Sequence, residues 1–200
     1  MNRSASNGPE RLGIFGGTFD PVHNGHLAAA SEARAALELD TVLLLPAGEP
    51  WQKTGVVDAP AADRLALVEV AVSGIAGLEA SDIEVVRRGP SYTVDTLEQL
   101  TQPERALTLL VGADVARGLS SWHRSDDLWD LATIAVFDRG ETGVPPKLKH
   151  RVETVAVPRL EISSSDVRER LLSGRPVDGL VPAAVVREIR ERHLYTARNG

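Results

Sequence analysis

Cysteine is missing from this 200-residue sequence, which excludes disulfide bridges and thiolate metal sites. No run approaches the roughly 20 apolar residues that a membrane-spanning helix needs. The polar stretch at 1–10 lacks the charged start and apolar run of a signal peptide. We therefore expect a protein of the reducing cytoplasm without a membrane partner.

Positive charge is also in deficit, because the formal net charge is −6. A nucleic-acid partner is not expected, since binding to phosphate backbones depends on an excess of lysine and arginine. Lysine occurs only at Lys53, Lys147 and Lys149. Any anionic ligand must therefore meet positive charge that is concentrated locally, and Lys53, in a polar loop, is one candidate.

Short apolar runs alternate with helical patterns along the chain. Strands are expected at 11–19, 41–47, 78–88, 106–114, 133–139 and 152–158, and helices at 25–40, 61–76, 92–102, 163–174 and 182–195. Strands that are apolar on both faces and separated by helices predict a parallel sheet with helices on both sides. We expect one doubly wound, Rossmann-like α/β domain over 11–196, after a disordered tail at 1–10 and with a flexible loop at 140–150. Such sheets bind ligands beyond the carboxyl ends of their strands.

The stretch GIFGGTFDPVHNGH at 13–26 joins the first strand to the first helix. Gly16 and Gly17 allow the backbone to approach a ligand, and the free N–H groups of a helix start favour a phosphate. His23 and His26 are three residues apart, so both imidazoles can donate hydrogen bonds to the same phosphoryl group. The alternative is a turn with two surface histidines. Zinc is disfavoured, because no third ligand lies nearby.

A second helix start, ISSSDVRERL at 162–171, is rich in serine. Its three serines can cap the helix or donate to phosphate, and Arg168 follows one turn later on the same side. Such a run alone is more typical of an ordinary helix cap. Two phosphate-suited helix starts in one parallel sheet together indicate a triphosphate held from two sides.

The segment GGTFDPVHNGH resembles the signature of the nucleotidyltransferases with an H-x-G-H motif, and specifically the bacterial nicotinate-nucleotide adenylyltransferase family. The likeness runs from Leu12 to about Tyr195. The segment ISSSDVR resembles the second motif of these enzymes, I-S-S-T-x-x-R, with Ser165 in place of threonine, which keeps a hydroxyl group. The resemblance implies an enzyme that converts ATP and nicotinate mononucleotide to deamido-NAD and pyrophosphate, with Mg²⁺ held mainly by the phosphates of ATP.

The resemblance also implies roles for individual residues. The catalytic residues would be His23, His26, Lys53 and Arg168. The ATP contacts would be Gly16, Gly17, Thr18, Phe19, His23, His26, Gly112, Asp114, Ile162, Ser163, Ser164, Ser165 and Arg168. The contacts with nicotinate mononucleotide would be Gly16, Lys53, Tyr92, Thr93 and Trp122.

Two further segments of the sequence, by the same resemblance, indicate what the second substrate is. SYTVDTL at 91–97 resembles the family segment whose Thr93 and adjacent N–H groups bind the nicotinate carboxylate, and a helix start suits an anion. GADVARGLSSW at 112–122 resembles the segment that leads to the aromatic residue on the pyridine ring, here Trp122. Asp114 would bond a ribose hydroxyl or merely cap a helix, and Arg64 is expected to be structural. No residue is assigned to a metal.

Other functions stay open at this point. One is another adenylyl- or cytidylyltransferase of the same superfamily, such as phosphopantetheine adenylyltransferase, although the segments at 91–97 and 112–122 favour nicotinate. A class I aminoacyl-tRNA synthetase is disfavoured, because the chain is short and acidic and lacks a K-M-S-K-S loop. The last is a nucleotide-binding module without catalysis. The sequence leaves the oligomeric state open.

Overall fold

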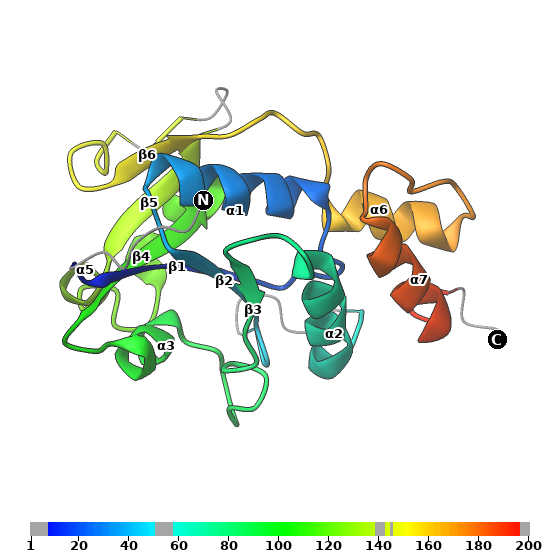
Figure 1. The fold of residues 1–200 in the computed structure, drawn as a ribbon, viewed down its shortest axis with the longest axis horizontal. Coiled ribbons are helices and arrows are strands. Elements are labelled where there is room, and N and C mark those ends of the chain that lie inside the picture. Colours follow the sequence, from blue (N-terminus) through cyan, green and yellow to red (C-terminus); the bar gives the residue numbers. More distant parts are fainter. Residues whose placement is uncertain (1–7, 51–57, 139–142, 145, 197–200) are drawn as a thin grey trace.

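The computed structural model describes residues 8–50, 58–138, 143–144 and 146–196. Figure 1 shows the elements, which in chain order are β1 (Glu10–Gly17), α1 (Asn24–Ala36), β2 (Thr41–Pro46), α2 (Ala61–Val72), β3 (Leu78–Ala80), α3 (Thr93–Leu100), β4 (Arg105–Gly112), α4 (Ala113–Ala116), the 3₁₀ helix η2 (Leu119–Ser121), α5 (Leu128–Leu131), β5 (Thr133–Asp138), β6 (Glu153–Ala156), α6 (Ser164–Leu172) and α7 (Ala183–Glu191).

The six strands form one parallel sheet in the order β3-β2-β1-β4-β5-β6. The chain builds one half of the sheet outward from β1, then returns to the other side of β1 and builds the second half. This is the strand order of doubly wound, Rossmann-like folds, so the predicted fold class is confirmed. The order reverses between β1 and β4, and this switch point is where a ligand is expected.

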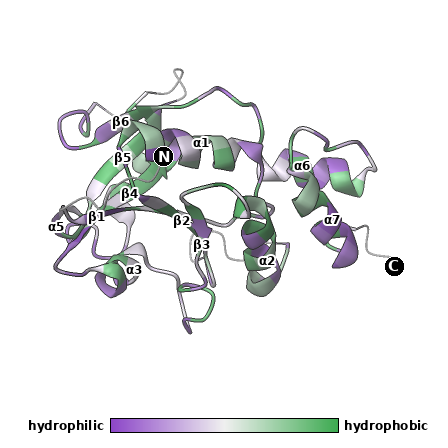
Figure 2. Ribbon diagram, viewed as in Figure 1, coloured by the Kyte–Doolittle hydropathy of each residue, from purple (hydrophilic) through white to green (hydrophobic). Residues whose placement is uncertain are grey.

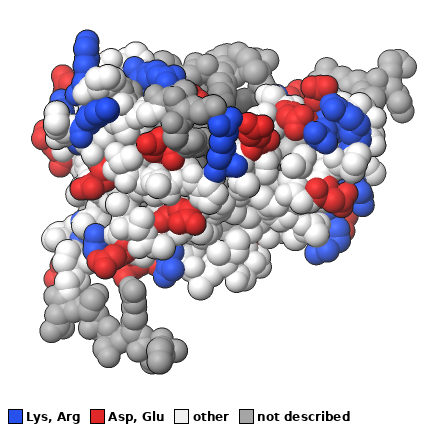
Figure 3. All heavy atoms as spheres, turned by 90° about the horizontal axis from the view of Figure 1, so that it is seen from above, with Lys and Arg blue, Asp and Glu red and all other residues white. Residues whose placement is uncertain are grey.

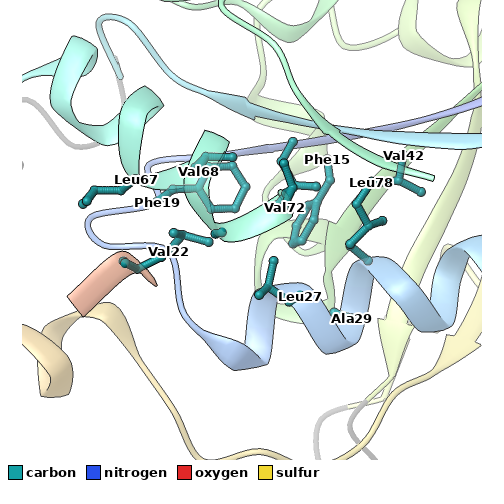
Figure 4. Close-up of a cluster of buried hydrophobic side chains, with 14 of the residues drawn as sticks. Phe15, Phe19, Val22, Leu27, Ala29, Val42, Leu67, Val68, Val72 and Leu78 are labelled. Carbon is teal, nitrogen blue, oxygen red and sulfur yellow. The ribbon is translucent and has the colours of Figure 1, made fainter. Parts of the chain in front are cut away.

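Alternation along the strands divides the core into two layers. In β1, Leu12 and Ile14 join the layer that packs against α3, α4 and α5, whereas Phe15 joins the layer against α1, α2, α6 and α7. Figure 4 shows part of this second layer, where Phe15 and Phe19 lie beside Leu67 of α2 and Leu27 of α1. The sheet is therefore covered on both faces, as its doubly apolar strands predict.

Hydropathy follows the same division. In Figure 2 most of the strand residues are hydrophobic, while the C-terminal end of α7 and several turns at the rim are hydrophilic. Helix α7 packs against α2, so the C-terminal helices extend the layer that contains α1 and α2. On the face shown in Figure 3, lysine and arginine lie among aspartate and glutamate rather than in one basic field. None of the helices in the described part of the chain has the length and apolarity needed to cross a membrane.

Most predicted elements are present with shorter ends, but the strand predicted at 78–88 is wrong. Only Leu78–Ala80 pairs with β2, and the chain then turns, with the N–H of Val86 donating to the carbonyl of Asp82 at 2.9 Å. Val86 is 69% exposed, so the run of β-branched residues did not mark a buried strand. At the other end, β1 begins at Glu10, one residue inside the predicted tail.

Candidate active site

A cleft of about 360 Å³ opens at the carboxyl ends of β1 and β4, where the strand order reverses. Gly16 and Gly112 line it, and a Cβ atom at either position would meet no other atom within 4 Å. Both backbones are therefore accessible to a ligand. The predicted site residues that line the cleft are Gly16, Gly17, Thr18, Phe19, His26, Thr93, Gly112, Asp114, Trp122 and Ser164.

The turn between β1 and α1 carries both histidines of the first motif. His23 is the N-cap residue of α1, and its ring stacks on that of His26 with 3.7 Å between the ring centroids. Phe19 meets the other ring, His26, edge-on at 4.9 Å and is itself buried. The two imidazoles are therefore held by carbon packing, and not as freely rotating surface side chains.

Hydrogen bonding fixes the orientation of His26. The backbone N–H of His23 donates to Nδ1 of His26 at 3.3 Å. In the neutral ring the remaining proton therefore resides on Nε2, which makes that nitrogen a donor. His26 lines the cleft, whereas His23 is 3% exposed and packs against the ring of His26. The pair consists of one residue facing the cleft and one that supports it.

The buried carboxylate of Asp20 anchors this turn to distant parts of the chain. It accepts hydrogen bonds from the N–H groups of Asp58 and Ala59 at 2.8 and 3.1 Å. It also accepts one from the hydroxyl of Tyr195 at 2.7 Å, near the end of the described chain. Burial, together with the Asp20 carboxylate, raises the pKa of Tyr195, so this hydroxyl stays a donor.

Arg64 is structural, as predicted. Its guanidinium is buried in α2 and donates to the carbonyls of Thr18 and Ala47, both at 2.6 Å, and of Ala59 at 3.1 Å. Burial lowers the pKa of Arg64, an effect that the nearby Asp20 carboxylate opposes. Arg64 thereby ties the loop after β1 to the loop after β2, and both loops line the cleft.

The second motif begins α6. Ser163 caps the helix, since its hydroxyl accepts from the N–H of Asp166 at 3.1 Å, and Ser164 donates to the carbonyl of Pro21 at 2.9 Å. Ser165 is exposed, and Ile162 packs against the core layer that contains α1. Of these four residues, only Ser164 lines the cleft.

Arg168 does not line the cleft. It donates to the backbone carbonyl of Asp20 at 2.8 Å and forms an ion pair with Asp58 at 2.5 Å. The first and second motifs are therefore in contact, as two helix starts beside one ligand would be. The guanidinium itself is occupied by Asp58 in this structure.

The cleft is also lined by residues on the α3 side of the sheet, namely Thr93, the first residue of α3, and Trp122, which follows η2. Trp122 is half-buried and packs against the core layer that contains α3. Tyr92 precedes Thr93, and its ring stacks on His123 with 4.2 Å between the ring centroids. The segments 91–97 and 112–122 are thus brought together, as predicted.

Two other predicted residues have different outcomes. Asp114, in the first turn of α4, lines the cleft and forms an ion pair with Arg117 at 3.0 Å. Lys53 and most of its loop lie outside the described residues, and so does part of the loop at 140–150.

Glu84 was missed by the sequence reasoning. It lines the cleft and is 6% exposed, and burial raises the pKa of its carboxyl group. The strand predicted over 78–88 hid it, because a glutamate in a strand is taken for a solvent-facing residue. The turn-forming pair Ser81-Asp82 just before it was the available signal.

Comparison with known proteins agrees with this geometry. A family model described as cytidylyltransferase-like matches residues 14–170. A "probable nicotinate-nucleotide adenylyltransferase" of Saccharopolyspora erythraea is 43% identical over 92% of this chain and 89% of the relative. One of Streptomyces coelicolor is 44% identical over 90% of this chain and 98% of the relative. The chain belongs to the nicotinate-nucleotide adenylyltransferase family.

Solved structures extend the likeness to the fold of this family. The nicotinic acid mononucleotide adenylyltransferase of Plasmodium falciparum, complexed with NaAD, matches with a TM-score of 0.76 and 16% identity, covering 93% of this chain and 97% of that one. The same protein complexed with APC matches with a TM-score of 0.77. At this identity the match to the solved structures establishes the shared fold alone. The family resemblance predicted from the motifs is confirmed by the relatives of higher identity.

Proposed function

We propose that this chain transfers the adenylyl group of ATP to nicotinate mononucleotide, which yields deamido-NAD and pyrophosphate. The observation that carries the proposal is a single cleft lined both by His26 at the start of α1 and by Thr93 and Trp122. The first of these suits a phosphate, and the other two suit an aromatic acid. The names of the relatives support the same reaction.

The proposed reaction needs positioning more than covalent chemistry. The phosphate of nicotinate mononucleotide is already ionised, so it attacks the α-phosphorus of ATP in line without a general base. A P–O bond forms as the bond to pyrophosphate breaks, and negative charge builds on the α-phosphoryl oxygens. Hydrogen-bond donors fixed at that point stabilise the transition state. His26, supported by His23, is proposed as one such donor.

Further positive charge would come from Lys53 and Arg168. Arg168 lies in the second turn of α6, beside the first motif, and would neutralise charge on the ATP phosphates, with hydroxyls from 163–165 as donors. Gly16, Gly17, Thr18 and Phe19 would bring backbone groups to the nucleotide. Gly112, Asp114 and Ile162 would contact the adenosine portion, with Asp114 on a ribose hydroxyl.

The second substrate would occupy the end of the cleft near α3. The N–H groups at the start of α3, next to Thr93, would donate to the nicotinate carboxylate. Trp122 would stack on the pyridine ring, with Tyr92 at the wall behind Thr93 and Gly16 and Lys53 near the phosphate. An amide in place of the carboxylate would turn an NH₂ donor toward these N–H donors.

Mg²⁺ is proposed to bind with ATP and to neutralise part of the triphosphate charge. In the ranges that the structure describes, no three His, Asp or Glu side chains lie together as a metal site. The side chains near the cleft therefore fit an ion that is held mainly by phosphate oxygens and water, as Mg²⁺ commonly is. Action in the cytoplasm belongs to the same proposal, because a chain without cysteine gains nothing from an oxidising compartment.

A pyrophosphate-release assay with ATP and nicotinate mononucleotide tests the proposal. Parallel reactions contain nicotinamide mononucleotide or phosphopantetheine in place of the acid, and CTP in place of ATP. We expect the acid with ATP to give by far the highest kcat/KM. Preference for another pair would assign the chain to a different transferase, and binding of ATP without any release would indicate a nucleotide-binding module.

A further inference from the structure

Glu84 is a buried acidic residue that the proposed chemistry does not use. It lies in the segment between β3 and α3, is 6% exposed and lines the cleft near Ser91 and Thr93. Burial raises the pKa of Glu84, so the protein bears a cost whenever this carboxylate is charged. The hydrogen bond from Thr96 and the charge of Arg87 offset only part of this cost.

Two hydroxyl groups meet at Glu84. Thr96 donates to Oε1 of Glu84 at 2.8 Å and accepts from Nη1 of Arg87 at 3.0 Å. The Ser91 side chain lies close enough to the Glu84 carboxyl to lower its pKa slightly. The Oγ atom of Ser91 also accepts the N–H groups of Gly48 and Glu49, at 2.9 and 3.3 Å.

The balance of donors and acceptors fixes the direction of these bonds. A serine hydroxyl has one proton and two lone pairs. Both lone pairs of Ser91 are engaged by backbone N–H groups, so its single proton is available to the nearby Glu84 carboxylate. A carboxylate can accept from both hydroxyls at once. An apolar side chain at position 84 would leave the protons of Ser91 and Thr96 without this acceptor.

This network joins two walls of the cleft. One wall is the loop after β2, where Ala47 and Pro50 line the cleft, and the other is the start of α3. The N–H of Ser91 also donates to the carbonyl of Glu49 at 3.0 Å. The loop comes so close that a Cβ atom at Gly48 would overlap the backbone oxygen of Glu84. The separation of the two walls depends on residues 84 and 91.

We propose that Glu84 is a positioning residue, which holds Ser91 and Thr96 so that the start of α3 stands at a fixed distance from the loop after β2. It touches no reacting atom. Its action is on the end of the cleft proposed for nicotinate mononucleotide, so the inference rests on the proposed function. Loss of the acceptor should weaken binding of that substrate and leave the ATP end unaffected.

The test compares Glu84→Met, which has a side chain of similar length and no carboxylate, with Glu84→Gln, which keeps one acceptor oxygen. We expect Glu84→Met to raise the KM for nicotinate mononucleotide about tenfold, because buried donors lose their acceptor. Glu84→Gln should restore KM to within about threefold, since its amide oxygen still accepts a hydrogen bond from one of the two hydroxyls. The KM for ATP and kcat should change less than about twofold in both variants.

Glu79→Gln, an exposed glutamate on β3, is the matched control and should leave all constants unchanged. Ser91→Ala breaks the same link from its other side and supplies the test if Glu84→Met does not fold. The double variant Glu84→Met/Ser91→Ala should have a KM no higher than the larger single effect, because both changes remove one connection.

Two results would overturn the inference while the proposed function stands. One is an active unmodified chain whose folded Glu84→Met and Ser91→Ala variants keep an unchanged KM for nicotinate mononucleotide. The other is an equal loss for ATP and for nicotinate mononucleotide that follows the thermal midpoint, which would give Glu84 a merely structural role. If the unmodified chain releases no pyrophosphate from this pair of substrates, the proposed function itself falls, and the inference falls with it.

Discussion

The starts of α1 and α6 are built differently although both are proposed to face the same phosphates. At α1, His26 is held by ring packing against His23 and Phe19 and by one hydrogen bond. At α6, Arg168 is held by an ion pair with Asp58, whose side chain is 61% exposed. The start of α1 holds the hydrogen-bond donor His26 in a fixed position, whereas α6 holds the cation Arg168 in an ion pair with a carboxylate.

The difference has a simple physical origin. An imidazole has apolar faces, so packing can fix it without neutralising any charge. A guanidinium at the edge of a cleft always carries its charge, and a nearby carboxylate stabilises it until a phosphate arrives. Asp58 contacts Nε of Arg168, so a phosphate that approaches this edge of the guanidinium competes with the Asp58 carboxylate. The first helix start is therefore suited to the transition state and the second to binding.

The largest expected effect comes from removing the packed donor. His26→Ala should lower kcat about 10²–10³-fold, the usual loss when one fixed transition-state donor is removed. The KM for ATP should change far less. Steady-state kinetics and a thermal melt check this, with the exposed His150→Ala as control. A folded His26→Ala protein with a normal kcat would remove the contrast between the two helix starts.

Arg168→Ala should act mainly on ATP binding. We expect kcat/KM for ATP to fall about 10- to 100-fold, because hydrogen bonds to a charged group are lost. The KM for nicotinate mononucleotide should stay within about twofold. Kinetics with each substrate varied in turn make the measurement. A structure with an ATP analogue whose triphosphate lies far from Arg168 would contradict the role assigned to α6.

Trp122→Ala extends the comparison to the pyridine end of the cleft. Stacking on an aromatic ring is worth about 1–3 kcal/mol, so the KM for nicotinate mononucleotide should rise about tenfold. The preference for the acid over the amide should not change, because Trp122 stacks on either ring. Kinetics with both mononucleotides measure the ratio. If the ratio of kcat/KM for the acid to kcat/KM for the amide falls in the variant, Trp122 itself contributes to recognition of the carboxylate.

Asp58→Asn sharpens the contrast directly, since it removes the carboxylate that competes for Arg168. An exposed ion pair is worth about 0.2–1 kcal/mol, so the KM for ATP should fall by up to about fivefold. The exposed Asp126→Asn serves as control. A KM for ATP that rises instead would mean that Asp58 holds Arg168 in its productive position.

The smallest effect concerns stability and pH. Burial raises the pKa of Glu84 in the folded chain above its ordinary value of 4.5. At a pH between the ordinary pKa and the raised one, the folded chain therefore keeps a proton on Glu84 that the unfolded chain has lost. The free energy of unfolding, measured against Glu84→Gln by denaturant titration, should therefore fall as pH rises from about 4.5 toward neutrality. If the difference in the free energy of unfolding between the two proteins does not vary with pH, burial does not disfavour the charged form of Glu84.

The sequence predicted the parts of the site that depend on local chemistry. Gly16 next to a strand, His23 and His26 at a helix start, and Ser163 as a cap all follow from short-range rules, and the structure has them there. That Thr93 and Trp122 line the same cleft was predicted from the family resemblance, because no local rule connects these two residues.

What the sequence did not reveal depends on contacts between distant segments. Nothing near Arg168 indicates that Asp58, 110 positions earlier, holds its guanidinium. Glu84 was hidden because β-propensity reflects packing against neighbours, whereas Val86, two residues later, is largely exposed to solvent. Strand order likewise depends on the whole chain, although the alternation of strands and helices predicted the class.

The hydrogen bond from Tyr195 to Asp20 connects positions 175 residues apart. β1 and the histidines of α1 leave the ribosome well before Tyr195, the residue that completes the anchoring of their turn. The growing polypeptide can form its sheet while this turn still lacks one of its partners. Termination of synthesis just before Tyr195 would thus yield a chain that has every predicted phosphate contact but lacks this hydrogen bond to the turn of the active site.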